Sequence, residues 1–194
     1  MSRQHCDQAI ELYDPVEHRQ LATRFAQDVR VTSLLYRSWA LWVLGYPESS
    51  LVDAEEAVAD AREIGQDATL IYSLLYASWT DLNCGKYLTA ETRLDEAVAL
   101  AIQRGVFYWN AVGTMHRGWF SAVTGKHSEA VSAISSGIRA WRATGATLWS
   151  PFFLSCLAMA HSQLHQPREA WRHIGEAMAT MRETKESVAR QSKS

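Results

Sequence analysis

A 40-residue internal repeat constrains the fold of this chain more than any other feature of its sequence. Glycines recur at that spacing in two series, Gly45, Gly85 and Gly125, and Gly65, Gly105 and Gly145. Four segments then align without a gap: EEAVADAREIG, DEAVALAIQRG, SSGIRAWRATG and GEAMATMRETK. Because a unit of this length cannot bury its own apolar face, neighbouring copies must stack on one another. The sequence therefore predicts a stacked repeat array.

Each copy predicts two helices joined by a tight turn. In the copy from Ser38 to Gly65, an apolar stripe at helical spacing ends at Gly45, which suits a helix C-cap. Pro47 cannot continue that helix but can open the next, which ends at Gly65. Helices joined by so short a turn lie antiparallel, and each keeps apolar surface for the neighbouring copy.

We expect an all-α protein, a right-handed α-solenoid of about four full 40-residue repeats preceded by an N-terminal half repeat. The partial repeat and a short connecting helix occupy 1–27, the helix pairs occupy 28–66, 67–106, 107–146 and 147–185, and a polar, frayed tail occupies 186–194. The eight repeat helices are expected near 31–45, 50–64, 68–84, 88–104, 107–124, 127–144, 148–165 and 167–184. The partial repeat suggests a chain that begins in the middle of a solenoid, as a piece of a longer protein would.

The aligned columns resemble those of the tetratricopeptide class. That class places a small residue in the first helix, a glycine at the turn, and Ala, a large apolar residue and Ala in the second helix; the matching columns fall at 50, 54 and 57 of the first full copy. Forty residues per copy exceeds the usual 34 or so. The resemblance implies a superhelical fold with a concave first-helix groove that binds peptides.

The run DVRVTSLLYRSWALWVLGYPESSLVDAEEAVADAREIG also resembles the carboxy-terminal helical-repeat region of bacterial proteins that carry a class III nucleotide cyclase domain and an ATPase module. LWVLGYPE is the most specific part of the match. This resemblance implies a regulatory or interaction platform in a bacterial signalling protein. The cyclase and ATPase residues themselves are absent from the sequence, so neither activity is implied.

Composition narrows the function classes. The chain has 194 residues, 47% of them hydrophobic, and a formal net charge of -2 without long runs of one sign, which disfavours nucleic acid or an anionic membrane as partner. The apolar run over 69–79 is too short to span a bilayer, and the start MSRQHCDQ lacks a signal-peptide core. Three cysteines without metal-ligand spacing are typical of reduced thiols. We therefore expect a cytoplasmic protein.

Catalytic and metal-binding motifs give no support to an enzyme. TGKHS lacks the first glycine of a phosphate loop, and HSQLH, with His161 and His165, lacks the glutamate of a metalloprotease helix. The acidic residues follow the outer faces of second helices, where they are expected to solubilise the surface. We expect no cofactor, no metal and no enzymatic activity.

A tryptophan ladder is the sharpest candidate for a binding site. Trp39, Trp79 and Trp119, followed by Met159, share one column of the first helices. In the tetratricopeptide class the matching position faces the groove, where aromatic residues would anchor a partner; aromatic stripes at helical spacing also commonly form the core, and both interpretations remain open. The full set of candidate partner-binding residues is Trp39, Trp42, Tyr72, Leu75, Trp79, Met115, Trp119, Phe152, Arg37 and Arg117.

We expect the chain to bind a protein or peptide partner, or other domains of a longer parent protein, along its first-helix face. One alternative is a sensor that holds a small apolar or aromatic ligand between repeats, with the same tryptophans as walls. Another is an oligomerisation module, because the N-terminal half repeat would expose Ala9, Ile10 and Tyr13 and promote a homodimer.

Overall fold

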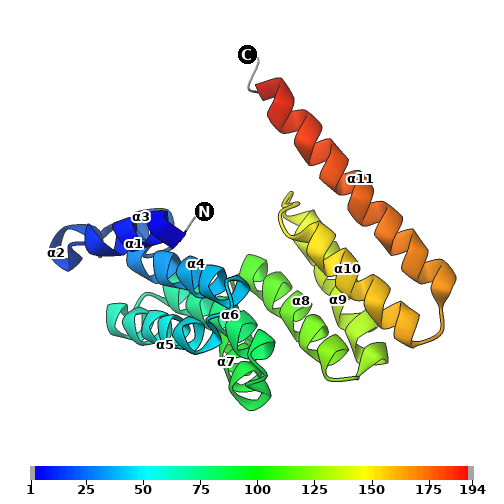
Figure 1. Cartoon of the computed structure of the whole chain (residues 1–194), viewed down its shortest axis with the longest axis horizontal. Helices are drawn as coiled ribbons and strands as arrows, with labels where there is room; N and C mark the ends of the chain where they lie inside the picture. Colours follow the sequence, from blue (N-terminus) through cyan, green and yellow to red (C-terminus); the bar gives the residue numbers. More distant parts are fainter. Residues whose placement is uncertain (1–2, 192–194) are drawn as a thin grey trace. The chain divides into compact units, whose positions relative to one another are not determined.

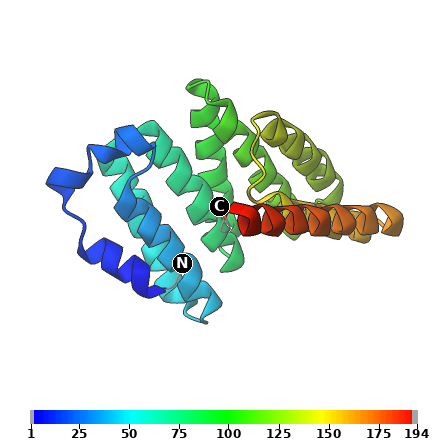
Figure 2. The same cartoon turned by 90° about the horizontal axis from the view of Figure 1, so that it is seen from above.

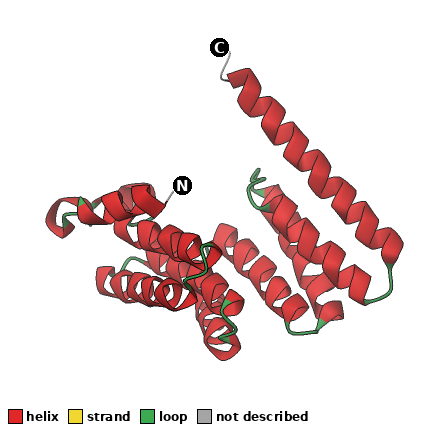
Figure 3. Ribbon diagram, in the orientation of Figure 1, coloured by secondary structure: helices red, strands yellow, loops and turns green. Residues whose placement is uncertain are grey.

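The structure is a computed structural model, which describes the backbone of residues 3–191 and the side chains of residues 3–183. Every regular element within this described part is a helix, and no strand occurs in it (Figure 3). The helices are α1 (Arg3–Glu11), α2 (Pro15–His18), α3 (Leu21–Phe25), α4 (Val29–Val43), α5 (Pro47–Ile64), α6 (Asp67–Asn83), α7 (Tyr87–Gln103), α8 (Phe107–Val123), α9 (His127–Ala143), α10 (Ser150–Gln163) and α11 (Pro167–Gln191). The expected all-α fold of helix pairs is confirmed.

The chain divides into two compact units, Met1–Trp109 and Asn110–Ser194. In the first unit, α4 packs on α5, α5 on α6, and α6 on α7 (Figure 1). The second helix of one pair, α5, therefore packs on the first helix of the next pair, α6. The N-terminal helix α1 packs on α4, and the two lie side by side in both views (Figure 2). In the second unit, α10 packs on both α9 and α11.

Glycine turns connect the two helices of each of the first three full pairs. Gly45 has a φ of 87°, and the amide of Tyr46 donates to the carbonyl of Leu41 at 2.9 Å, as in a Schellman motif. The last pair makes the same turn without glycine, because His165 occupies the left-handed region with a φ of 57°. The amide of Gln166 then donates to the carbonyl of His161 at 2.9 Å.

Small residues allow the helices of a pair to approach closely. A Cβ atom added to Gly118 on α8 would lie 2.5 Å from the side chain and 2.8 Å from the backbone nitrogen of Ile134 on α9. In the first unit, the hydroxyl of Ser38 lies 2.7 Å from that of Thr80 and donates to the carbonyl of Ser50 at 2.9 Å, joining α4, α5 and α6. These contacts explain why the aligned columns keep small residues.

The N-terminal segment differs in detail from the expectation. Asp14 caps α2 by accepting from the amide of Val16 at 2.8 Å, and Pro15 occupies the first turn, as its position in the sequence indicates. The single short helix expected here is divided into α2 and α3, and α3 ends at Ala26 with a φ of 59°.

The C-terminal helix also differs from the expectation. Helix α11 extends to Gln191, beyond the end expected near residue 184. Residues 192–194 of the expected tail lie outside the described part of the chain.

Candidate functional site

Aromatic side chains from two neighbouring first helices meet on one side of the first unit. We call Tyr36 and Trp39 of α4, together with Tyr72, Tyr76 and Trp79 of α6, the aromatic cluster. Its centre is Trp39, whose ring centroid lies 4.7 Å from that of Trp79 and 5.1 Å from that of Tyr76. The indole nitrogen of Trp39 donates to the carbonyl of Tyr76 at 3.4 Å. The rings are therefore held by one another and by the backbone of α6.

The cluster has a buried base and a partly exposed top. Tyr72 and Tyr76 are buried, whereas Tyr36, Trp39 and Trp79 are half-buried. Trp42, three residues after Trp39 on α4, is 40% exposed. Desolvation is the main cause of the raised pKa of Tyr72, in keeping with its place at the buried base of the cluster. Trp39 and Trp79 thus contribute to the packing of α4 on α6 and also expose part of their rings to solvent.

Several other residues expected to contact a partner pack in the core. Leu75 and Met115 have almost no exposed surface, and Trp119 is also buried. Phe152 is half-buried, with its ring 5.5 Å from that of Trp119 in an edge-to-face arrangement. Leu75, Met115 and Trp119, like Tyr72, therefore present little or no surface to a partner. We therefore treat Trp39, Trp42 and Trp79 as the accessible aromatic part of the predicted site in the first unit.

Arg37 is held in an ion-pair network. Its Nε and one terminal nitrogen donate to the two carboxylate oxygens of Asp53 at 2.7 and 2.8 Å, and its other terminal nitrogen donates to Asp7 at 3.0 Å. These bonds raise the pKa of Arg37, Asp53 contributing most. The network joins α1, α4 and α5, so this guanidinium has its carboxylate partners within the chain. Arg117 of α8 is exposed.

The residues expected to mediate self-association are half-buried. Ala9, Ile10 and Tyr13 all fall in or just after α1, which packs on α4. The hydroxyl of Tyr13 donates to Asp28 at 2.6 Å, and burial together with this bond raises the pKa of Tyr13 to about 12. The chain's own helix α4 therefore covers part of the surface that the sequence predicted to be open.

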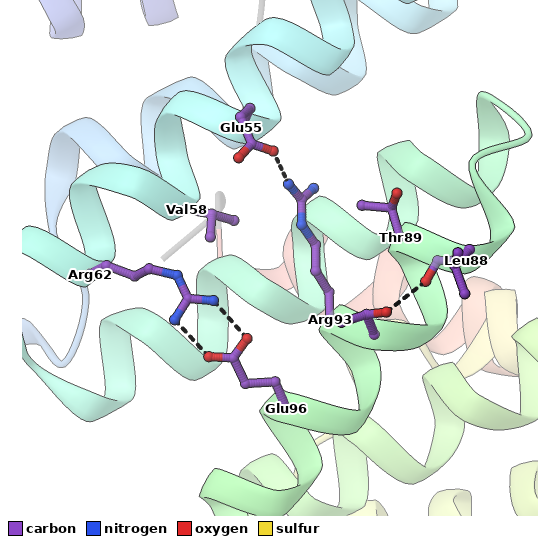
Figure 4. A pocket seen from close by; sticks show the side chains of 8 residues that line it. Glu55, Val58, Arg62, Leu88, Thr89, Arg93 and Glu96 are labelled. Carbon is purple, nitrogen blue, oxygen red and sulfur yellow. Dashed lines mark hydrogen bonds and ion pairs between the residues drawn. The ribbon is translucent and has the colours of Figure 1, made fainter.

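A groove of about 380 Å³ lies between α5 and α7 (Figure 4). Arg62 of α5 donates to both carboxylate oxygens of Glu96 on α7, at 2.7 and 2.6 Å. Arg93 of α7 pairs with Glu55 of α5 and with Asp81 of α6, 2.7 Å away. Each charged side chain that lines the groove thus has a partner of opposite sign, and the pairs tie the two second helices together. The sequence analysis missed these pairs because their members lie 12 to 38 residues apart.

Buried polar pairs recur at one register position in two repeats. Asp81 and Arg93 are both buried, and burial raises the pKa of Asp81 to about 6, although Arg93 opposes the shift. Eighty residues later the same positions hold His161 and His173, whose rings stack with centroids 5.2 Å apart. His161 Nδ1 lies 2.7 Å from the Gln166 side-chain oxygen. Both pairs join the two helices of their repeat.

Neither a metal centre nor a membrane span emerges from the described residues. No three or more histidine, cysteine or carboxylate side chains in this part of the chain are arranged to hold a metal ion. Residues 3–191 likewise include no helix with the length and apolar character needed to cross a bilayer. Cys6 and Cys156 are buried free thiols.

Successive helix pairs with glycine turns and close-packed small residues define a tetratricopeptide-like helical-repeat protein. The family model described as anaphase-promoting complex subunit 5 matches residues 31–81, 65–105 and 147–191, together more than half of the chain. The chain belongs to this family of helical-repeat sequences.

Comparison of structures agrees with this fold. The crystal structure of MamA superposes with a TM-score of 0.53 at 14% identity, over 95% of this chain and 93% of that chain. No curated protein sequence matches the chain.

Proposed function

We propose that this chain is a non-enzymatic interaction module that binds a segment of a partner protein on the first-helix side of α4 and α6. One observation carries the proposal: the aromatic cluster leaves Trp39 and Trp79 half-buried beside Trp42, which is 40% exposed. Tryptophan is over-represented among residues that dominate binding energy at protein interfaces. The helical-repeat family and fold support the same class of function.

The geometry suits apolar side chains of an extended or helical segment. Tyr72 and Tyr76 lie beneath the indole rings, so the rings are ordered before binding and lose little conformational entropy when a partner docks. Arg37 already has two carboxylate partners, so it adds little free charge to this side. The partner is then selected mainly by shape and apolar contact. A cytoplasmic location and a role beside signalling domains of a longer bacterial protein remain part of the proposal.

The small-ligand alternative has weaker support. It would require a pocket walled by the tryptophans. The groove of about 380 Å³ is lined instead by paired charges of α5 and α7, with Val58 and Leu88 as its apolar residues.

The proposal is tested by panning a random peptide library displayed on phage against the purified chain and measuring the affinity of enriched peptides. We expect Trp42→Ala and Trp79→Ala each to weaken binding by roughly tenfold or more. Circular dichroism should retain the helical signal of the unmodified chain for both variants, because neither side chain is fully buried.

The matched control is Trp171→Ala, which removes a tryptophan that is 72% exposed on α11. It should leave the affinity unchanged. Peptides that bind equally well to the Trp42→Ala and Trp79→Ala variants would contradict the proposal.

A further inference from the structure

An apolar stripe on α11 is unusually exposed. Trp171, Ile174, Met178 and Met181 follow one another at spacings of three, four and three residues, which places them along one side of the helix. Trp171 is 72% exposed, and Met178 and Met181 are each 49% exposed. We call these four residues the α11 stripe. Large apolar side chains clustered in this way mark an interaction surface more often than isolated ones do.

Earlier repeats bury the residues aligned with Ile174, Met178 and Met181, whereas those aligned with Trp171 are half-buried (Leu51 and Val131) or exposed (Glu91). Val58 and Ile138, which align with Met178, are only 4% and 5% exposed. Ala61 and Trp141, which align with Met181, are 0% and 2% exposed. The helices that carry these residues, α5 and α9, are covered by the following first helices, α6 and α10. Met178 and Met181 therefore lie on the surface that a further helix covers elsewhere in the repeat array.

The other face of α11 already packs within its own repeat. Ala170, His173 and Ala177 are buried, and α11 packs on α10. The stripe is thus a second apolar surface on the same helix, additional to the one that holds α11 in its repeat. Burial of such surface contributes roughly 25 cal/mol per Å².

We propose that the α11 stripe is a homodimer interface, in which α11 of one copy pairs antiparallel with α11 of a second copy. The 3–4–3 spacing is that of the seam between two paired helices. A second copy brings an identical stripe, so a two-fold interface buries both stripes at once. This interface is separate from the aromatic cluster and does not depend on its function.

The antiparallel arrangement matches the side chains of the stripe. Trp171 of each copy lies opposite Met181 of the other, and Ile174 lies opposite Met178. Methionine adapts its shape to an aromatic neighbour and makes favourable sulfur–aromatic contacts. Gly175 is near the centre of the pair, and a Cβ atom added to it would meet nothing within 4 Å. The two helices can therefore approach closely at the middle of the seam.

Self-association through the N-terminal residues Ala9, Ile10 and Tyr13 fits the structure less well. These residues are half-buried where α1 packs on α4. Tyr13 is also bonded to Asp28. The structure thus favours self-association at the α11 stripe over the N-terminal surface.

The test is light scattering of the full chain after gel filtration, between about 10 and 200 µM. We expect a mass twice that of the 21.8 kDa chain at the upper end of this range. The double variant Met178→Glu with Met181→Glu should be monomeric at the same concentrations, because pairing would bury four unpaired carboxylates. The control Met159→Glu introduces the same charge at a methionine that is 40% exposed on α10, and it should remain dimeric.

Crosslinking provides an independent readout without added charge. Met178→Cys in a Cys84→Ser background should give a covalent dimer with a short bismaleimide, whereas Ser136→Cys, exposed on α9, should not. The native Cys6 and Cys156 are buried and do not compete. A chain that is monomeric at about 200 µM, or a dimer that survives the double glutamate variant, would overturn the proposal.

Discussion

Asp81 illustrates how burial sets the behaviour of a single charge. Asp81 is buried, and its carboxylate accepts a hydrogen bond from Arg93 at 2.7 Å. Its pKa is raised to about 6, because desolvation outweighs the attraction of the guanidinium. Removing one member of such a pair is more damaging than replacing both, because the remaining group is buried without a partner.

The pH dependence of stability follows from that raised pKa. Between the ordinary carboxyl pKa of about 3.9 and the folded value of about 6, the folded chain binds more protons at Asp81 than the unfolded chain does. The contribution of Asp81 to stability is therefore full below about pH 4 and is lost as pH rises to about 6. We expect Asp81→Asn to reduce the loss of stability between pH 5 and pH 7 that urea titrations record.

The matched control for this prediction is Asp95→Asn, which removes an exposed carboxylate from α7. The difference in stability between pH 5 and pH 7 should then remain close to that of the unmodified chain. If Asp81→Asn leaves that difference unchanged, burial does not govern the protonation of Asp81.

At the scale of the element, each helix pair depends on a turn with one left-handed residue. Gly125 has a φ of 86°, whereas the equivalent His165 has a φ of 57° and carries a side chain. A left-handed backbone is strained by about 1–2 kcal/mol in residues other than glycine. The last turn is therefore the least favourable of the aligned helix–helix turns.

We predict that His165→Gly stabilises the chain by about 0.5–1 kcal/mol, the relief of strain being partly offset by the greater freedom of glycine when unfolded. His165 is exposed, so little packing is lost. Thermal unfolding followed by circular dichroism measures the effect. The reciprocal variant Gly125→His should destabilise by a similar amount, and a change of the same sign in both variants would contradict the explanation.

At the scale of the whole molecule, we expect each compact unit to have its own free energy of unfolding. The chain forms two compact units, Met1–Trp109 and Asn110–Ser194. In repeat proteins, stability is close to a sum of the terms within repeats and between nearest neighbours. Unfolding of one unit therefore does not require the other to unfold at the same time.

Leu74→Ala and Leu154→Ala test this expectation, because each removes a buried leucine from one unit. Such changes destabilise by about 2–5 kcal/mol. Hydrogen exchange read by mass spectrometry should show faster exchange in α4–α7 for Leu74→Ala and in α9–α11 for Leu154→Ala. Equal acceleration throughout the chain in both variants would indicate a single cooperative unit.

The sequence by itself determined the repeat period, the helix pairs and their turns. Gly45 and Pro47 act through their own backbone geometry, and Asp14 caps α2 by accepting from an amide two residues away, so these features follow from local chemistry. The resemblance to tetratricopeptide repeats led to the same fold. The left-handed backbone of Ala26, which follows α3, could not be predicted in this way, because nothing in an alanine indicates a left-handed backbone.

Only the tertiary structure decided which members of the tryptophan ladder reach the surface. Trp39 and Trp79 are half-buried but Trp119 is buried, although all three occupy the same column of the repeat. The pairing of Arg37 with Asp7 and Asp53 was likewise hidden, since these residues come from three helices. Exposure and pairing depend on the sizes of neighbouring side chains and on the approach of packed helices, and a periodic sequence pattern records neither.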